Sequence, residues 1–272
     1  MSQITRAMEM VSAAKMRKAQ QRVVAARPYA DKLREVIADL SSVSADPEAL
    51  AQFPLLAPRK EIKAVGIILI TPDRGLTGAL NTNILRRATK YITQDAGVPV
   101  EIVAAGKKGR DFMVRTGQNV VAEFTGLGDS LKLEDMRAIA EVAIEDFLNG
   151  KIDAVHVVYA EYVNTLTQRP VVKQLLPIET PAESDGFSDY IFEPNGREVL
   201  QAILPRYAEV QLYQAFLESV ASEHSARMVA MKNATENAKD LVASLSLTYN
   251  KARQAQITQE VAEIAAGANA LG

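Results

Sequence analysis

The chain has 272 residues, of which 48% are hydrophobic and 24% are charged, a balance typical of a folded protein of one or two domains. Its 31 Lys and Arg nearly cancel its 33 Asp and Glu, so the whole molecule has no general attraction to nucleic acid or anionic membranes. With no cysteine, no run of about 18 apolar residues and no secretory signal pattern, the sequence excludes disulfides, thiolate chemistry and a membrane-spanning helix.

The distribution of glycine divides the chain into three parts. Residues 1–65 and 197–266 contain no glycine, whereas twelve of the 14 glycines lie within residues 66–196. Because glycine is the commonest helix terminator, both outer parts are predicted to be helical. We therefore expect an N-terminal helical part (1–60), a central α/β domain (61–196) and a C-terminal helical part (197–272).

The N-terminal part has apolar residues at alternating steps of three and four, the spacing of a coiled-coil seam. Pro28 is expected to kink this helix without ending it. The seam positions are Met16, Ala19, Val23, Ala26, Ala30, Leu33, Ile37 and Leu40.

The same helix is basic, because residues 1–37 hold eight Lys or Arg against three Asp or Glu. Such a charge excess fits a solvated face, a nucleic-acid contact or a track for an acidic protein. Nucleic acid is disfavoured because no stacking aromatics accompany the cations. A solvated face and an acidic protein partner are left open.

The central part alternates β-branched runs with amphipathic segments, which is typical of βαβ units and predicts a Rossmann-like parallel sheet with right-handed crossovers. A further strand at 168–176 contains Pro170, which favours an edge position. The predicted strands cover 64–71, 100–104, 119–124 and 154–159, and the predicted helices cover 76–94, 107–116 and 132–149.

No catalytic, cofactor or metal site is expected in the central part. The loop 71–78 follows the first strand, where a phosphate loop would lie, but its glycines lack phosphate-loop spacing, which favours a tight strand-to-helix turn. His156 and His224 are the only histidines, and neither has the neighbours of a triad or a metal site. Glu134 and Asp135 begin a helix, where carboxylates complement the helix dipole.

The C-terminal part contains its last proline at Pro205, so one helix is predicted from Arg206 to about Ala266. Its length of roughly 90 Å far exceeds that of a compact central domain, so most of it should project. Coiled-coil spacing recurs here and predicts an antiparallel pair with the N-terminal helix; the positions are Met228, Met231, Thr235, Ala238, Val242, Leu245, Tyr249 and Ala252. Further on, Ile257, Val261 and Ile264 start a different stripe, which predicts a different partner for the tip.

Several segments, spread over the whole chain, resemble the gamma subunit of F-type ATP synthases of bacterial type. The C-terminal match is the most specific, with I-T-x-E and E-I-x-x-G-A in the order of that family's signature. This sequence begins well inside the family's first helix and lacks the cysteine-bearing insertion of plastid members, so thiol control is not expected. The matching segments are 4–16, 27–30, 73–76 with Asn81, 190–194, 222–231 and 249–268.

The resemblance implies a non-catalytic rotor without cofactors that couples ion flow to ATP synthesis or hydrolysis and regulates ATPase activity. Its shaft would stand in a hexamer of alpha and beta subunits, with the α/β domain against the epsilon subunit and the c ring. The complex would lie at the cytoplasmic face of the cell membrane, with this subunit peripheral to it.

The resemblance also implies site residues by position. Tyr190 and Glu193 match the foot that meets epsilon and the c ring. The residues that match contacts with the beta subunit are Arg6, Met8, Arg227, Arg253, Gln254, Thr258 and Glu260.

Two other interpretations stay open at the level of the sequence. One is an α/β nucleotide-binding regulator with a helical oligomerisation arm, and the other is a coiled-coil scaffold with a basic arm. ATP binding by the purified chain would favour the regulator. A tip that does not affect ATP turnover in a complex would favour the scaffold.

Overall fold

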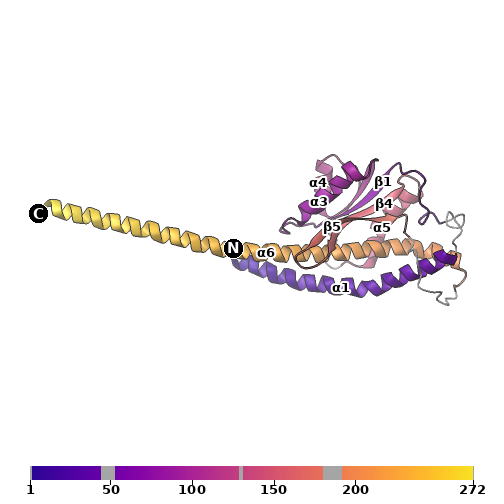
Figure 1. The fold of residues 1–272 in the computed structure, drawn as a ribbon, viewed down its shortest axis with the longest axis horizontal. Coiled ribbons are helices and arrows are strands. Elements are labelled where there is room, and N and C mark those ends of the chain that lie inside the picture. Colours follow the sequence, from indigo (N-terminus) through magenta and orange to yellow (C-terminus); the bar gives the residue numbers. More distant parts are fainter. Residues whose placement is uncertain (1, 44–52, 129–130, 180–191, 272) are drawn as a thin grey trace.

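A computed structural model describes residues 2–43, 53–128, 131–179 and 192–271. Two long helices form a shaft, and a small α/β domain lies against one part of it (Figure 1). The first helix, α1, spans Ser2–Val43, and the last, α6, spans Gly196–Leu271 and has 76 residues, or roughly 114 Å at 1.5 Å per residue. The α/β fold class and the antiparallel shaft are confirmed, whereas the division of the chain into domains 1–60, 61–196 and 197–272 stays a prediction.

The two helices run antiparallel. At one end the Thr5 and Thr235 hydroxyl oxygens are 2.7 Å apart, and at the other end a Cβ on Gly196 would lie 3.1 Å from Leu40 Cδ2. Ala19, Ala30 and Ile37 of the predicted seam are all buried. Small side chains at this seam let the two backbones approach closely, and Pro28 lies inside α1 without ending it, as predicted.

The predicted start of the last helix is wrong, because α6 begins at Gly196 and contains Pro205. Asn195 begins it with a reciprocal cap: its Oδ1 accepts the Glu198 N–H at 2.9 Å, and its amide donates to Glu198 Oε1 at 2.8 Å. Leu200, Leu204 and Ala208 around the proline are buried in the core. Their burial offsets the hydrogen bond that proline cannot donate.

The domain holds a five-stranded sheet in the order β3-β2-β1-β4-β5. The first four strands are mutually parallel, and β5 is antiparallel to β4 at the edge, where Pro170 was expected to place it. The strands are β1 (Val65–Ile70), β2 (Val100–Ala105), β3 (Val120–Phe124), β4 (Ala154–Tyr162) and β5 (Gln168–Leu176).

Helices cover both faces of this sheet. The larger core joins one face to α5 (Leu133–Leu148) and to the shaft through residues such as Ile68, Phe147 and Leu212. The smaller core joins the opposite face to α3 (Leu80–Lys90) and α4 (Lys107–Arg115), with Ile84 and Met113 completely buried. A short π-helical segment, Tyr91–Asp95, continues α3. The helices α3 and α4 therefore lie on the side of the sheet remote from the main shaft contact (Figure 1).

Candidate functional site

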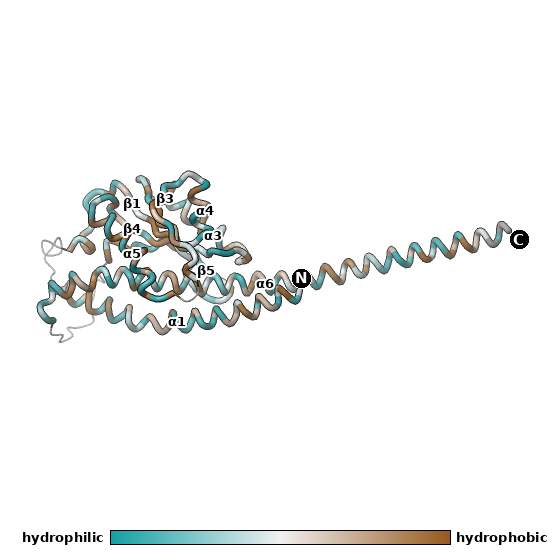
Figure 2. Tube along the Cα trace, turned by 180° about the vertical axis from the view of Figure 1, so that it is seen from behind, coloured by the Kyte–Doolittle hydropathy of each residue, from teal (hydrophilic) through white to brown (hydrophobic). Residues whose placement is uncertain are grey.

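The half of α6 beyond Ala238 projects from the rest of the molecule. Every residue from 239 to 267 is exposed, over a length of roughly 43 Å. Hydrophobic residues recur along this segment (Figure 2). Those with large exposed side chains are Leu241, Val242, Leu245, Leu247, Tyr249, Ile257, Val261 and Ile264. An apolar surface of this extent is typical of a protein interaction site.

Part of the predicted coiled-coil seam is therefore wrong. Met231 and Thr235 are buried where α6 packs against α1. Val242, Leu245 and Tyr249, in contrast, are 59–65% exposed, and Ala252 is exposed too. The reason is the position of α1: its first turn, at Thr5, already lies opposite Thr235. Only three described residues of α1, Ser2–Ile4, precede Thr5, so α1 does not reach the part of α6 that holds Val242, Leu245 and Tyr249.

Four of the candidate contact residues lie together on this projecting segment. Arg253, Gln254, Thr258 and Glu260 are all exposed and fall within about two helical turns. Their hydrogen bonds stay within the helix: Thr258 Oγ1 donates to the Gln254 carbonyl at 2.8 Å, and Gln256 donates to Glu260 Oε1 at 3.1 Å. These side chains do not stabilise the rest of the fold and are available to a partner.

Arg227 lies about 39 Å from Arg253, toward the N-terminal end of α6, and its side chain bonds to other parts of the same chain. Its guanidinium donates to Glu223 Oε1 at 2.6 Å and to the Gly75 carbonyl at 3.4 Å, and its side chain is only 12% exposed. Arg227 thus fixes the loop after β1 to the shaft.

Met8 and Arg227 line the same hollow, of about 440 Å³, between the start of α1 and the loop 74–76. Arg6 is exposed and precedes Ala7, which lines this hollow, and Leu76 in the loop is 61% exposed with φ at 64°. The structure therefore brings Arg6, Met8 and Arg227 into one region near the emerging shaft. Arg253 and its neighbours form a second, separate region.

The foot of the shaft carries the other two candidates. Glu193 is exposed just before α6, in a segment that ends at Pro194. Tyr190 lies outside the described residues.

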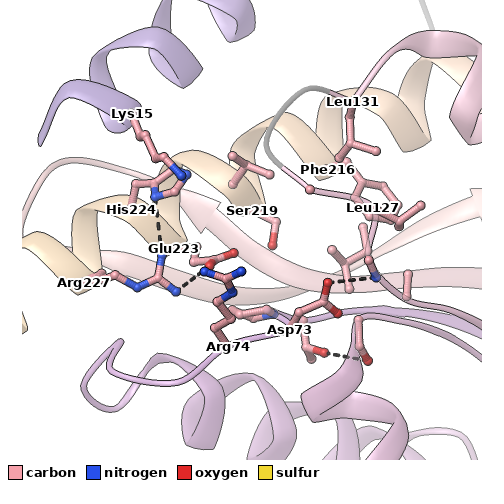
Figure 3. A pocket seen from close by; sticks show the side chains of 18 residues that line it. Lys15, Asp73, Arg74, Leu127, Leu131, Phe216, Ser219, Glu223, His224 and Arg227 are labelled. Atoms are coloured by element: carbon pink, nitrogen blue, oxygen red, sulfur yellow. Dashed lines mark hydrogen bonds and ion pairs between the residues drawn. The ribbon is translucent and has the colours of Figure 1, made fainter. Parts of the chain in front are cut away.

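A cavity of about 260 Å³ lies where the carboxyl ends of β1 and β2 meet the shaft. Figure 3 shows Asp73 and Arg74 on one side of it and Glu223, His224 and Arg227 of α6 on the other. In doubly wound folds this edge of the sheet is the usual place for a ligand.

Here, however, the carboxylate of Asp73 occupies the position that a bound anion would take. Asp73 Oδ1 accepts the N–H of Lys107, the first residue of α4, at 2.8 Å, and Oδ2 accepts the Gly126 N–H at 2.9 Å. A Cβ on Gly106 would lie 1.8 Å from the Thr71 carbonyl oxygen, so backbone fills the space beside it. The α4 N-terminus therefore already has its carboxylate, and this geometry disfavours a phosphate there.

The loop between β1 and α3 differs from the predicted tight turn. It runs from the end of β1 at Ile70 to the start of α3 at Leu80 and reaches across to α4 through Asp73. Its glycines and turn residues gave no sign that its exposed tip, Arg74 to Leu76, would lie beside the shaft. The contact between Arg227 and Gly75 spans 152 residues, so only the folded structure reveals it.

The two histidines lie in separate places. His156 in β4 is within 3.1 Å of the Tyr91 hydroxyl, and burial lowers the pKa of its imidazole. His224 is buried on α6, with its Nδ1 3.5 Å from Arg227 Nη1. In the described parts of the chain, no group of three or more His, Asp or Glu side chains could hold a metal ion.

One half-buried acid of α6, Glu218, was not found from the sequence. Glu218 Oε2 accepts a hydrogen bond from the Tyr159 hydroxyl at 3.1 Å, and burial raises the pKa of the Glu218 carboxyl. Burial likewise raises the pKa of the Tyr159 phenol. Because the two residues come from β4 and α6, no local pattern could have paired them.

Among the described helices, none combines the length and the apolar character that a bilayer span requires.

Comparisons with known proteins agree with one another. A family model described as ATP synthase matches residues 1–271. The ATP synthase gamma chain of Roseiflexus castenholzii is 56% identical, and the alignment covers 100% of this chain and 93% of the relative. The gamma chain of Chloroflexus aurantiacus is 55% identical over 99% of this chain and 93% of its own length. That of Legionella pneumophila is 46% identical over 98% and 93%.

Two solved assemblies contain chains of similar fold. One is from the central stalk and c ring of the Tetrahymena thermophila mitochondrial ATP synthase, with a TM-score of 0.64, 21% identity and coverage of 85% of this chain and 99% of that chain. The other is from the Euglena gracilis mitochondrial ATP synthase, with a TM-score of 0.60, 19% identity and coverage of 95% of each chain. At these identities they support the fold, whereas the family model and the curated relatives establish the family. The chain belongs to the gamma-chain family of ATP synthases.

Proposed function

We propose that this protein is the central-stalk rotor of an F-type ATP synthase and that it transmits torque without catalysing a reaction. Ion flow through a c ring would turn it, and its rotation would change the conformations of the catalytic subunits in a hexamer of alpha and beta. The enzyme would lie at the cytoplasmic face of the cell membrane, with this chain peripheral to the bilayer.

The observation that carries the proposal is the projecting half of α6. None of the apolar side chains from residue 239 to 267 is buried by the described parts of the chain. Such a stripe favours a partner that surrounds or flanks the helix. A bearing made by a hexamer would cover Ile257, Val261 and Ile264, while small side chains such as Ala262, Ala265 and Ala266 would avoid a deep energy minimum at any single angle of rotation.

Coupling requires that the rotor contacts each beta conformation differently. A shaft can shift the equilibrium between conformations only by its differential contact free energy with them. Arg253, Gln254, Thr258 and Glu260 are exposed polar groups on one short segment, so they suit contacts that form and break during each turn.

A second contact region would lie where the shaft leaves the domain. Arg6 and Met8 of the basic helix suit an acidic segment of beta, and Arg227 supports the neighbouring loop through Gly75. At the foot, Glu193 is exposed and suits a contact with epsilon or the c ring, and Tyr190 is proposed for the same surface by family position.

A nucleotide-binding regulator is the weaker alternative. The Asp73 carboxylate accepts the Lys107 N–H at the start of α4 and the Gly126 N–H in the segment after β3, so it occupies backbone donors that a phosphate would need there. ATP chemistry is therefore assigned to the alpha and beta subunits, and no catalytic residue is assigned to this chain.

The test is a reconstituted complex of this chain with an alpha and beta hexamer. Replacing Arg253 and Gln254 by Ala should lower ATP turnover about tenfold, since about 1.4 kcal/mol of lost contact in the rate-limiting state corresponds to a factor of ten. Circular dichroism of the isolated chain should not change, because both side chains are exposed. The matched control is Arg197→Ala with Gln201→Ala, an exposed Arg and Gln pair at the other end of α6. Unaltered turnover in the tip variant would contradict the contact role.

A further inference from the structure

The outer layer of the domain, α3 with its π-helical continuation and α4, is strongly basic. Residues 80–95 and 107–115 together contain seven Lys or Arg and two Asp, a local excess of five positive charges. The whole chain, in contrast, has a formal net charge of −2. Along the sequence, the N-terminal helix stands out as basic, whereas this second basic surface forms only when the fold brings α3 and α4 together.

A groove of about 580 Å³ runs between α3 and α4 on this layer. Leu85 and Phe112, both half-buried, give it an apolar floor, and Arg86, Lys90 and Arg115 stand along it with exposed side chains. The lining on α3 and its π-helical continuation extends from Thr82 to Gln94, or roughly 18 Å along the helix. The groove is therefore about three helical turns long.

Its cations are not neutralised within the described chain. Arg86 and Lys90 have no ion-pair partner among the described residues, and none of the residues that line the groove is acidic. The two aspartates of the layer are used elsewhere: Asp95 pairs with Arg87 at 2.7 Å, and Asp111 pairs with Arg110 at 2.9 Å. Arg115 lies over the ring of Phe112, with its guanidinium carbon 5.8 Å from the ring centroid, so its charge borders the apolar floor.

We propose that this groove binds an acidic amphipathic helix of a partner protein. An apolar floor bordered by cations complements a helix with a narrow apolar stripe flanked by Glu or Asp, and amphipathic helices bind such grooves through residues three and four apart. Charge complementarity would set the orientation of the helix and speed its association. The groove is open and three turns long, which fits a helical segment better than a small molecule.

The location separates this surface from the contacts with alpha and beta that are proposed for the shaft. The helices α3 and α4 cover the sheet face away from the main shaft contact, and the groove shares no residue with the projecting half of α6 (Figure 1). The inference therefore does not depend on the proposed rotor function, and a test of one can fail without the other.

The experiment measures binding of a fluorescent synthetic peptide to the full chain by anisotropy. The peptide is an amphipathic helix of about four turns with a Leu stripe flanked by Glu, and its control has each Glu replaced by Gln. We expect saturable binding of the acidic peptide that weakens as salt is raised. Arg86→Glu with Arg115→Glu should weaken it at least about tenfold through repulsion at the groove.

The matched control is Lys107→Glu with Lys108→Glu. Both lysines are exposed at the start of α4 and outside the groove, and the change in net charge is the same. Binding within about twofold of the unmodified chain is expected for this control. If Arg86→Glu with Arg115→Glu fails to fold, Arg86→Gln with Lys90→Gln provides the same comparison at two exposed positions of α3.

Four results would overturn the inference. The first three are the absence of saturable peptide binding, equal weakening of binding by the groove and control variants, and equal binding of the Gln peptide. In the fourth, the chain binds vesicles of anionic phosphatidylglycerol through the groove residues but does not bind the peptide. The last result would assign the basic layer to a membrane surface.

Discussion

Glu218 illustrates how one half-buried side chain joins the domain to the shaft. Its carboxyl lies near Tyr159, Lys173, Glu161 and Arg27, and burial is the largest influence that raises its pKa. A carboxyl whose pKa is higher in the folded than in the unfolded chain stabilises the fold below its unfolded pKa, near 4.3. That contribution is lost as the pH rises through the folded pKa.

Glu218→Gln should remove this loss, because the amide oxygen can still accept the Tyr159 hydrogen bond without carrying a charge. The free energy of unfolding of the variant, relative to the unmodified chain, should therefore increase between pH 4 and pH 7. Urea denaturation at several pH values measures it. Glu61→Gln is the matched control, since Glu61 is 76% exposed, and its difference should stay flat across the same range. If the difference in free energy of unfolding is independent of pH for Glu218→Gln as well, burial does not raise the pKa of the Glu218 carboxyl.

At the scale of elements, α6 is one continuous helix with two very different environments. Residues such as Leu204, Ala208 and Leu212 are buried against the domain, whereas every residue from 239 to 267 is exposed. In the isolated chain, backbone amides of 241–267 should exchange hydrogen much faster than those of 204–225, because local opening there breaks no tertiary contact. Hydrogen exchange with mass spectrometry compares both halves in one sample. Assembly with the alpha and beta subunits should then slow exchange in 241–267, and equal protection of both halves in the isolated chain would contradict the prediction.

The sequence predicted elements well where the signal was local. The predicted strand at 168–176 has the same bounds as β5, and helix 107–116 differs from α4 by one residue, because β-branched runs and flanking glycines are local features. The predicted start at Arg206 differs from the start of α6 because the cap at Asn195 and the buried core around Leu204 outweigh the helix-breaking effect of Pro205. For the contact residues, the sequence supplied family positions but not surroundings. It could not show that Arg227 binds Gly75 or that Asp73 caps α4, since both contacts join residues far apart in the chain.

At the scale of the whole molecule, the proposed mechanism treats the shaft and the domain as one body. Residues of α1 and α6 pack over the full length of α1, and the contact nearest the projecting tip is the pair of hydroxyls of Thr5 and Thr235, 2.7 Å apart. If torque passes through a rigid rotor, α1 and α6 do not need to separate or slide at this point during a turn. A covalent link there should then leave rotation intact.

Thr5→Cys with Thr235→Cys tests this in the reconstituted complex. Because the two hydroxyl oxygens are 2.7 Å apart, the two side chains face each other, and mass spectrometry of the oxidised subunit verifies that the disulfide has formed. The natural chain contains no cysteine, so within this subunit the link can form only there. We expect the oxidised complex to keep ATP turnover within about twofold of the reduced complex, because a link inside a rigid body adds no barrier to its rotation. The two single-cysteine variants control for loss of the buried hydroxyl. Turnover that falls on oxidation and returns with a thiol reductant would show that the helices move against each other, and the shaft would then act by bending rather than by rotating as a unit.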